Sequence, residues 1–345
     1  MAINLHEKYA NQIQTEFKRE SLIANRLSTN FDFTGVKTVN VVTPITVPMT
    51  DYVRSGVNRY GNPVEMEDIV QELTLTQDKS FTMTIDKGNN ADQSGVKAAG
   101  KMLSLQIAEQ AVPLMDTYCL NKLAHDAGKI VQADEALSAS NICSRITAGT
   151  TELDNAEVPA EDRTLYISAE NYALLRKSDE FLKCDALINK SLSRGQVGTY
   201  DGMAVIKVPA SRWPTNVNFM IVHKSSACAP VKLNDTKLHN DPPGISGNLL
   251  EGRQYYDLFV FGARAKGIYV EVDENAQVVV TPKIASNGTI TCDTAGATIK
   301  YTTDGSDPRY SKSAIEGASA PNEGTIKACA VIAGAFPSDV ATLEK

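Results

Sequence analysis

The side chains with the clearest catalytic potential are four carboxylates in one short polar segment: Glu65, Glu67, Asp68 and Glu72. Paired carboxylates catalyse glycoside hydrolysis, in which one acts as the acid and the other as the base or nucleophile. The same cluster also suits a hydrated loop tip, or a patch that meets a basic surface on a neighbouring molecule. We favour the non-catalytic role, since no convergent set of titratable groups accompanies the cluster.

The histidines and cysteines do not indicate a metal centre or an activated nucleophile. Only four histidines occur, and none stands in an HExxH motif or with a GxSxG serine. The closest constellation is Asp116, Cys119 and His125, which on a helix is typical of a solvated face plus a core position. The six cysteines form no CxxC pair and fit reduced, idle thiols. We therefore expect no enzyme, no cofactor and no metal site.

A second polar motif, IKYTTDGSDP, lies near the end of the chain. Asp304-Gly305 favours a tight turn with positive φ, and Asp307-Pro308 starts the loop beyond it. Both aspartates could also bind calcium, but the turn role explains them without a metal.

Length and charge limit the function classes. The chain has 345 residues, so two or three units are expected. Its net charge of −7 disfavours sequence-specific binding of nucleic acid, although a protein can enclose a polymer without binding it tightly. No apolar run reaches the roughly 18 residues of a membrane span, and the charged N-terminus does not resemble a signal peptide.

The N-terminal segment carries a thin apolar stripe at four-residue spacing: Leu5, Tyr9, Ile13 and Phe17. On a helix this stripe is too narrow for a core and predicts a docking arm. Its partner is either its own domain or a neighbouring subunit.

Two alternating runs predict an extended ribbon. The first spans residues 38–47, where Pro44 favours an edge strand, and the second places Phe81, Met83 and Ile85 on one face. A lone two-stranded ribbon is marginal in water, so this apolar face needs cover that the local sequence does not supply.

The strongest helical pattern runs from Asp92 to about Gly128, with Val96, Leu103 and Ile107 on its apolar side. Pro113 is expected to kink or split this helix, because proline lacks the amide donor and clashes one turn back.

The remaining chain has a mixed α and β pattern followed by short strands. RTLYISAENYALLRKS predicts a strand, a helix cap at Ser168 and a helix, while GTYDGMAVIKVP predicts a turn and a strand. From about Val278 the short strands are separated by Gly, Pro, Asn and Ser, which indicates a separate small β unit.

The order of these parts resembles the major capsid proteins of tailed bacteriophages over residues 1 to about 277. The most family-like runs are FTMTIDKGNNADQ, AEQAVPLMDTY and GQVGTYDGMAVIKVP. The resemblance implies an α+β fold with these parts: an N-terminal arm (1–35), an extended two-stranded loop (36–90), the spine helix of a peripheral domain (91–135), an axial domain (136–250) and peripheral return strands (251–277).

The tail resembles the chitobiase C-terminal type of immunoglobulin-like module, on the match IKYTTDGSDPRYS, GTIKACAV and Pro337-Ser338. This second resemblance implies a small β-sandwich over residues 278–345. In a capsid this module would be displayed on the outer surface as a decoration, and its presence does not imply enzymatic activity.

Together the resemblances imply a structural capsid protein that self-assembles into an icosahedral or prolate shell around the phage genome. The implied partners are further copies in hexamers and pentamers, a separate scaffolding protein, a portal and enclosed double-stranded DNA, with no membrane. The implied location is the virion capsid, assembled in the host bacterial cytoplasm. The candidate contacts between subunits are Leu5, Tyr9, Ile13, Phe17, Arg54, Arg59, Glu65, Glu67, Asp68, Phe81, Met83 and Ile85.

Some relatives cross-link a lysine of the extended loop to a neighbouring subunit, but Lys79 and Lys87 are ordinary ribbon-end lysines and we predict no cross-link.

The alternative function is a carbohydrate-binding surface or adhesion protein that uses the C-terminal module. Sugars usually stack on exposed aromatic rings, and the tail offers only Tyr301, Tyr310 and Phe336.

Overall fold

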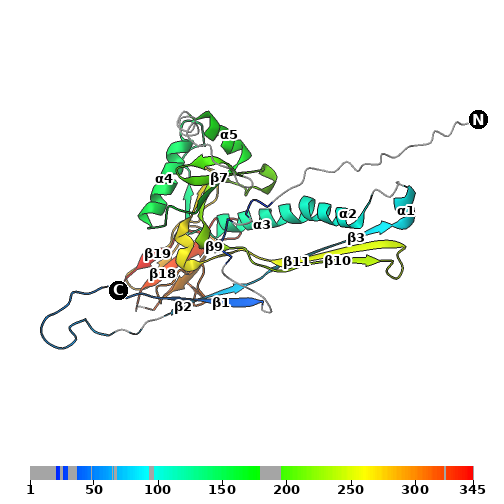
Figure 1. The fold of residues 1–345 in the computed structure, drawn as a ribbon. Coiled ribbons are helices and arrows are strands. Elements are labelled where there is room, and N and C mark those ends of the chain that lie inside the picture. The colour runs from blue at the N-terminus through cyan, green and yellow to red at the C-terminus, as the bar shows by residue number, and fades with distance from the viewer. Residues whose placement is uncertain are drawn as a thin grey trace, which may run out of the picture.

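The computed structural model describes residues 21–23, 26–29, 37–47, 49–63, 65, 68–92, 97–178, 196–321 and 324–344. The described chain is elongated (Figure 1). A helical rod and a set of long strands extend to one side, an α/β unit stands above them, and the loop between β1 and β2 projects to the opposite side. The predicted arm residues Leu5, Tyr9, Ile13 and Phe17 lie outside the described residues.

A six-stranded sheet forms the centre of the α/β unit, in the order β4-β13-β8-β5-β7-β6. Its strands are β4 (Lys129–Gln132), β5 (Arg163–Ser168), β6 (Gln196–Tyr200), β7 (Met203–Val208), β8 (Val217–His223) and β13 (Ile268–Val272). Every residue of β5, β8 and β13 is buried, as expected for strands that are covered on both faces. The predicted strand–cap–helix order is confirmed: the side chain of Ser168 accepts a hydrogen bond from Asn171 N, 3.0 Å away, at the start of α5 (Ala169–Lys177).

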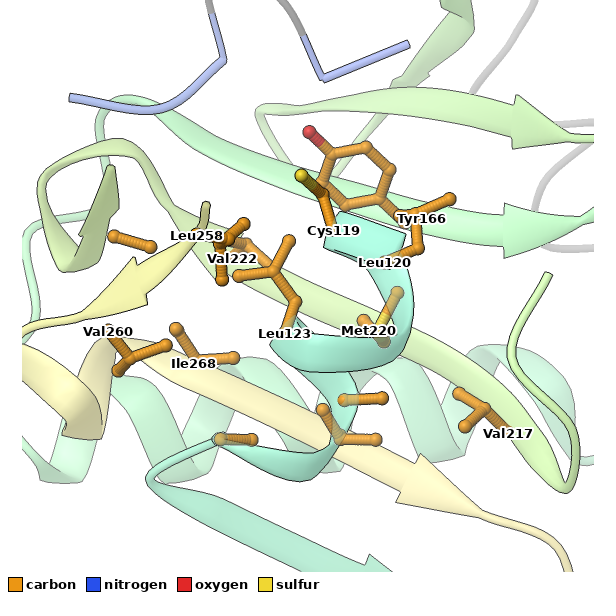
Figure 2. Packing of buried hydrophobic residues seen from close by; sticks show 14 of the residues in the cluster. Cys119, Leu120, Leu123, Tyr166, Val217, Met220, Val222, Leu258, Val260 and Ile268 are labelled. Carbon is orange, nitrogen blue, oxygen red and sulfur yellow. The ribbon is translucent and has the colours of Figure 1, made fainter. Parts of the chain in front are cut away.

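Helices cover the two faces of this sheet with separate cores. On one face, α4 (Ile142–Asn155) and α5 pack against alternate residues such as Leu165 and Ile221. On the other face lies α3 (Val112–His125), whose Leu120 and Leu123 are fully buried. Figure 2 shows Cys119, Leu120 and Leu123 on one turn of α3 among residues of the sheet. The same helix is therefore part of the rod and a wall of the α/β core.

The rod consists of α2 (Ala99–Gln106), the π-helical turn η1 (Ile107–Ala111) and α3, which follow one another without a break (Figure 1). Pro113 lies in the first turn of α3, immediately after η1. Val112 N donates to Ile107 O, five residues back, so the π turn shifts the hydrogen bonds at the place where proline removes a donor. The predicted division at Pro113 is thus a local change of helix type. Among the described residues, no helix is long and apolar enough to cross a membrane.

The long strands pair differently from the ribbon expected from the sequence. β3 (Gln77–Asp86) pairs with β11 (Gly247–Tyr256), which pairs with β10 (Val231–Asn240). β1 (Thr38–Pro44) pairs instead with β2 (Asp68–Thr74), and the short helix α1 (Lys87–Asp92) follows β3. The expectation that the run 80–86 forms the second ribbon strand is therefore wrong, because that strand finds its partner far along the chain.

The C-terminal unit is a small β-sandwich, as its sequence pattern predicts. One sheet has the order β17-β16-β18-β19 and the other pairs β14 with β15. The strands are β14 (Lys283–Ile284), β15 (Ile290–Thr291), β16 (Thr298–Thr302), β17 (Ile315–Glu316), β18 (Ile326–Val331) and β19 (Ala341–Leu343). This unit is not detached from the body, because Phe336 belongs to the core that surrounds α3.

Short elements connect these parts. They are η2 (Ala210–Arg212), η3 (Lys224–Ser226), β9 (Ala227–Cys228), β12 (Phe259–Val260) and η4 (Gly262–Gly267). β9 pairs with β12 below the α/β unit. Cys228 of β9, Phe259 of β12 and the nearby Phe261 form a third core with Leu73 and Leu75, which anchors the end of the β1–β2 pair.

Candidate assembly surface

The most exposed apolar side chains of the described chain lie in the loop that joins β1 to β2. Met49 is fully exposed, and Val57 and Tyr60 are 92% and 87% exposed. Tyr52 and Val53 in the same loop are about half exposed. Apolar side chains gathered on a projection are typical of a contact with another molecule.

This loop has internal structure of its own. Val53 N donates to Arg59 O at 3.0 Å, and Gly61 N donates to Asn58 O at 2.9 Å. The rings of Tyr52 and Tyr60 meet edge to face, with centroids 5.0 Å apart. Because these bonds restrict the backbone of the loop and the two rings support each other, less conformational entropy is lost when the tip binds a partner.

Charge is distributed unevenly along the loop. Arg54 and Arg59 lie exposed at the tip, and Arg59 Nε donates to Gly56 O at 3.1 Å. Glu65 and Asp68 lie exposed near the start of β2, while Glu67 lies outside the described residues. A cationic tip and an anionic neck can attract one another between two copies of the chain.

The alternative of glycosidase chemistry in the acidic cluster receives no support from Glu72. Its carboxylate oxygen lies 2.7 Å from Lys312 Nζ, and the hydrogen bond and charge of Lys312 lower the pKa of Glu72. A general acid for glycoside hydrolysis needs the opposite shift, because it must stay protonated near neutral pH.

The base of the β1–β2 pair is tied to the body by polar and apolar contacts. Gln71 Nε2 donates to Val260 O at 2.8 Å, and Gly262 N donates to Gln71 Oε1 at 2.9 Å. Leu73 and Leu75 are buried beside this amide. The projection is thus anchored at one end and exposed at the other.

The remaining sequence-predicted residues fall in several places. Ile85 is buried within the single chain, whereas Phe81 and Met83 are half-buried on β3. Leu103 and Ile107 are half-buried on the rod, and Val96 lies outside the described residues. The contact role of these side chains stays a prediction, and Ile85 has the least surface left to offer.

Two buried carboxylates, Asp257 and Asp116, join the rod to other elements. Asp257 accepts from Lys122 Nζ and Tyr118 Oη of α3, both at 2.7 Å, and from Thr76 N at 2.9 Å. Burial would raise the pKa of Asp257, but these hydrogen bonds and the Lys122 charge outweigh burial and lower it. The sequence signal for this buried role is an aspartate that stands between apolar residues in the run YYDLF.

Asp116 is the second carboxylate, and it lies at the other side of α3. It accepts from Arg212 Nη1 at 2.8 Å, Ser21 Oγ at 2.7 Å and Leu22 N at 3.0 Å. The expectation of a solvated face at this position is wrong, since Asp116 is fully buried. It joins the helix to the start of the described chain.

The other members of the candidate triad also have structural partners. His125 Nδ1 donates to Asn121 O, 2.9 Å away, and the His125 ring stacks on Phe336 with ring centroids 4.5 Å apart. Burial raises the pKa of the Cys119 thiol to about 12, which keeps it protonated and unreactive. Within the described ranges, no group of three His, Cys, Asp or Glu side chains is placed to hold a metal ion.

The turn motif of the tail forms as expected from its residues. Gly305 has φ of +74°, and Asp304 Oδ1 accepts from Ser306 N at 3.0 Å. Asp307 Oδ1 accepts from Arg309 N at 2.9 Å, across Pro308. Local hydrogen bonds therefore occupy both aspartates.

The aromatic side chains of the tail do not form an exposed platform for sugars. Tyr301 and Phe336 are buried, and Tyr310 Oη donates to Asp126 O at 2.6 Å. All three rings are used in packing or in contact with the body, which removes the main support for glycan stacking.

The C-terminal strands match a family model described as "Fn3 associated" over residues 289–344. No curated protein matches the chain. The family match covers the unit after β14 and says nothing of the body.

Solved structures align with more than three-quarters of the chain. A chain described as "Mycobacterium phage Che8" aligns with a TM-score of 0.59 and 16% identity, covering 78% of this chain and 98% of that one. "Capsid structure of the Cyanophage P-SCSP1u" aligns with a TM-score of 0.64 and 13% identity, over 79% and 94%. "Asymmetric unit of bacteriophage PhiM1 mature capsid" aligns with a TM-score of 0.60 and 13% identity, over 79% and 93%.

Proposed function

We propose that this chain, whose fold is that of phage capsid structures, is the repeating structural subunit of a phage shell. The observation that carries the proposal is the likeness to chains of two capsid structures, of which more than nine-tenths is covered. The ordered apolar tip of the β1–β2 loop supplies the kind of surface that such an assembly needs.

In this proposal the tip of one copy packs on the body of the next copy. A contact between two different patches is heterologous, so repetition closes into rings when the rotation allows it. Met49, Val57 and Tyr60 supply the apolar contact, and Arg54 and Arg59 supply charge that meets acidic groups such as Glu65. No catalytic step is part of this function.

The wider assembly follows from the same proposal. Copies form hexamers and pentamers in a virion shell that encloses double-stranded DNA, built in the host cytoplasm with a separate scaffolding protein and a portal. The net charge of −7 favours enclosure of DNA over tight binding to it. The C-terminal unit is displayed on the outer surface of this shell.

The test is a double substitution at the tip, Val57→Glu with Tyr60→Glu, in the full chain. Both side chains are exposed, so the variant should fold with an unchanged unfolding temperature. It should fail to form shells, as measured by sedimentation and negative-stain electron microscopy. The matched control is Val280→Glu, an exposed apolar residue of the C-terminal unit, which should assemble as the unchanged protein does.

Normal shells from the tip variant would defeat the role of the loop. Absence of shells from the unchanged protein, with or without co-expressed phage proteins, would defeat the proposed function as a whole. A carbohydrate-binding role would instead show as binding of the full chain to a glycan array.

A further inference from the structure

We propose that the C-terminal unit is an intramolecular brace that holds the β1–β2 pair at a fixed angle to the rod. Residues 309–312 of this unit contact the end of α3 and the open edge of β2. The consequence for shell geometry rests on the proposed function, whereas the brace itself does not.

The first attachment caps the C-terminal end of the rod. Tyr310 Oη donates to Asp126 O at 2.6 Å, and the guanidinium of Arg309 donates to Ala127 O at 3.1 Å and Gly128 O at 3.1 Å. Carbonyls at the end of a helix lack partners within it, and a cation there also interacts favourably with the helix dipole. Tyr310 thus binds the C-cap carbonyl of α3 from 184 positions away in sequence, and Arg309 binds the two carbonyls that follow it.

The guanidinium is fixed in place by its own unit. Arg309 Nη2 donates to Asp307 Oδ2 at 2.7 Å, and the side chains of both residues are less than one-fifth exposed. A buried, paired guanidinium with several hydrogen bonds has one preferred geometry. The attachment to α3 is therefore rigid.

The second attachment lies on β2. Lys312 N donates to Val70 O at 3.3 Å, and Lys312 Nζ lies 2.7 Å from Glu72 Oε2. In the described structure β2 pairs only with β1, so Lys312 occupies the edge that remains. Edge strands are normally protected in some way, and here the C-terminal unit protects this one.

A cavity lies between the two attachments, with a volume of about 310 Å³. Its lining includes Gln71 of β2, Ala265 of η4 and Tyr310 of the C-terminal unit. Side chains do not fill this joint to the density of a core, so discrete polar contacts set the angle there. Leu73 and the following Leu75 are buried in a core of the body, whereas residues 68–72 are held by the Gln71 hydrogen bonds to Val260 and Gly262 and, in addition, by the brace.

The test is hydrogen exchange of the full-length, unassembled protein. In Lys312→Glu the new carboxylate repels Glu72, so residues 68–72 should exchange roughly fivefold faster, as expected for loss of one surface ion pair. Residues 73–75 should keep their protection. The exchanged pair Glu72→Lys with Lys312→Glu should restore the original rate.

Lys283→Glu is the matched control, because Lys283 pairs with Asp293 at 2.8 Å within the C-terminal unit and away from β2. It should leave exchange at residues 68–72 unchanged. Unchanged exchange in Lys312→Glu, or a change that the exchanged pair does not reverse, overturns the brace.

Electron microscopy of the assembled shells tests the proposed function separately. If shells form, Lys312→Glu should broaden their diameters in electron micrographs, and uniform diameters would limit the brace to the single chain. If the unchanged protein forms no shells, the exchange result still decides whether the brace exists.

Discussion

At the scale of single residues, Asp257 carries an unusually large share of the polar contacts between elements. One carboxylate accepts hydrogen bonds from α3, from the residue before β3 and from the backbone of Leu258. It is fully buried, so loss of its charge would leave Lys122 without its partner. Removal of one member of a buried ion pair is among the more costly single changes.

Asp257→Asn should lower the free energy of unfolding by about 3 kcal/mol at neutral pH. The folded pKa of Asp257 is lowered, so its contribution is complete above the ordinary aspartate value and is lost as pH falls through the folded pKa. The difference between the two proteins should thus be constant at neutral pH and shrink below about pH 4. Urea unfolding at several pH values measures both effects.

Asp78→Asn is the control for this change. Asp78 also pairs with a cation, Arg253, at 2.5 Å, but both side chains are about half exposed. Its substitution should have a much smaller effect than that of Asp257, because solvent screens exposed pairs. Equal effects would mean that burial does not decide the contribution of these carboxylates.

At the scale of elements, the pairing of β3 with β11 depends on one close approach. Gly252 lies opposite Phe81, and a Cβ built on Gly252 would be 2.2 Å from an atom of the Phe81 ring. The ring therefore lies over the glycine, as aromatic residues often do across a sheet. This contact fixes which residues of the two strands face each other.

Gly252→Ala should destabilise the protein by about 2 kcal/mol, because the methyl group and the ring cannot both fit. Gly100→Ala on α2 is the matched control: its Cβ meets nothing within 4 Å, and alanine should leave stability unchanged or raise it. Thermal unfolding measures both. Combining Gly252→Ala with Phe81→Leu should recover part of the loss, and the absence of recovery would argue against the ring contact.

The elements that the sequence predicts well are those set by neighbouring residues. The strand before Ser168, its cap and the following helix depend on local periodicity and one side-chain hydrogen bond. The partner of β3 was not predictable in this way, because alternation marks a strand but does not say which distant strand pairs with it. Asp116 was missed for a related reason, since its partner Arg212 lies 96 positions away.

The candidate assembly surface was likewise predictable only in its locally encoded features. Arg54 and Arg59 were identified from the sequence, whereas the exposed apolar residues Met49, Val57 and Tyr60 were missed because the segment is polar in composition. The ordering of Tyr52 against Tyr60 and the anchoring of Gln71 depend on tertiary contacts that no local pattern contains. Sequence thus indicates which segment projects, and the structure gives its geometry.

At the scale of the whole molecule, the C-terminal unit is part of the body and not merely attached to it. Phe336 stacks on His125 and lies in the core that surrounds α3, while Arg309 and Tyr310 cap that helix. A module that supplies core and cap to its neighbour should unfold together with it. The unit that carries the family match at residues 289–344 therefore contributes to the packing of the body.

Truncation after residue 277 should consequently destabilise the remaining body. The exposed core around α3 should bind an apolar dye, and the unfolding temperature should fall well below that of the full chain. In the full chain, Phe336→Ala should by itself cost about 3 kcal/mol, because a buried ring leaves a cavity between the two parts. Calorimetry of the unchanged protein should show one cooperative transition, whereas two separate transitions, with a truncated body as stable as the full chain, would mean that the unit is an independent decoration.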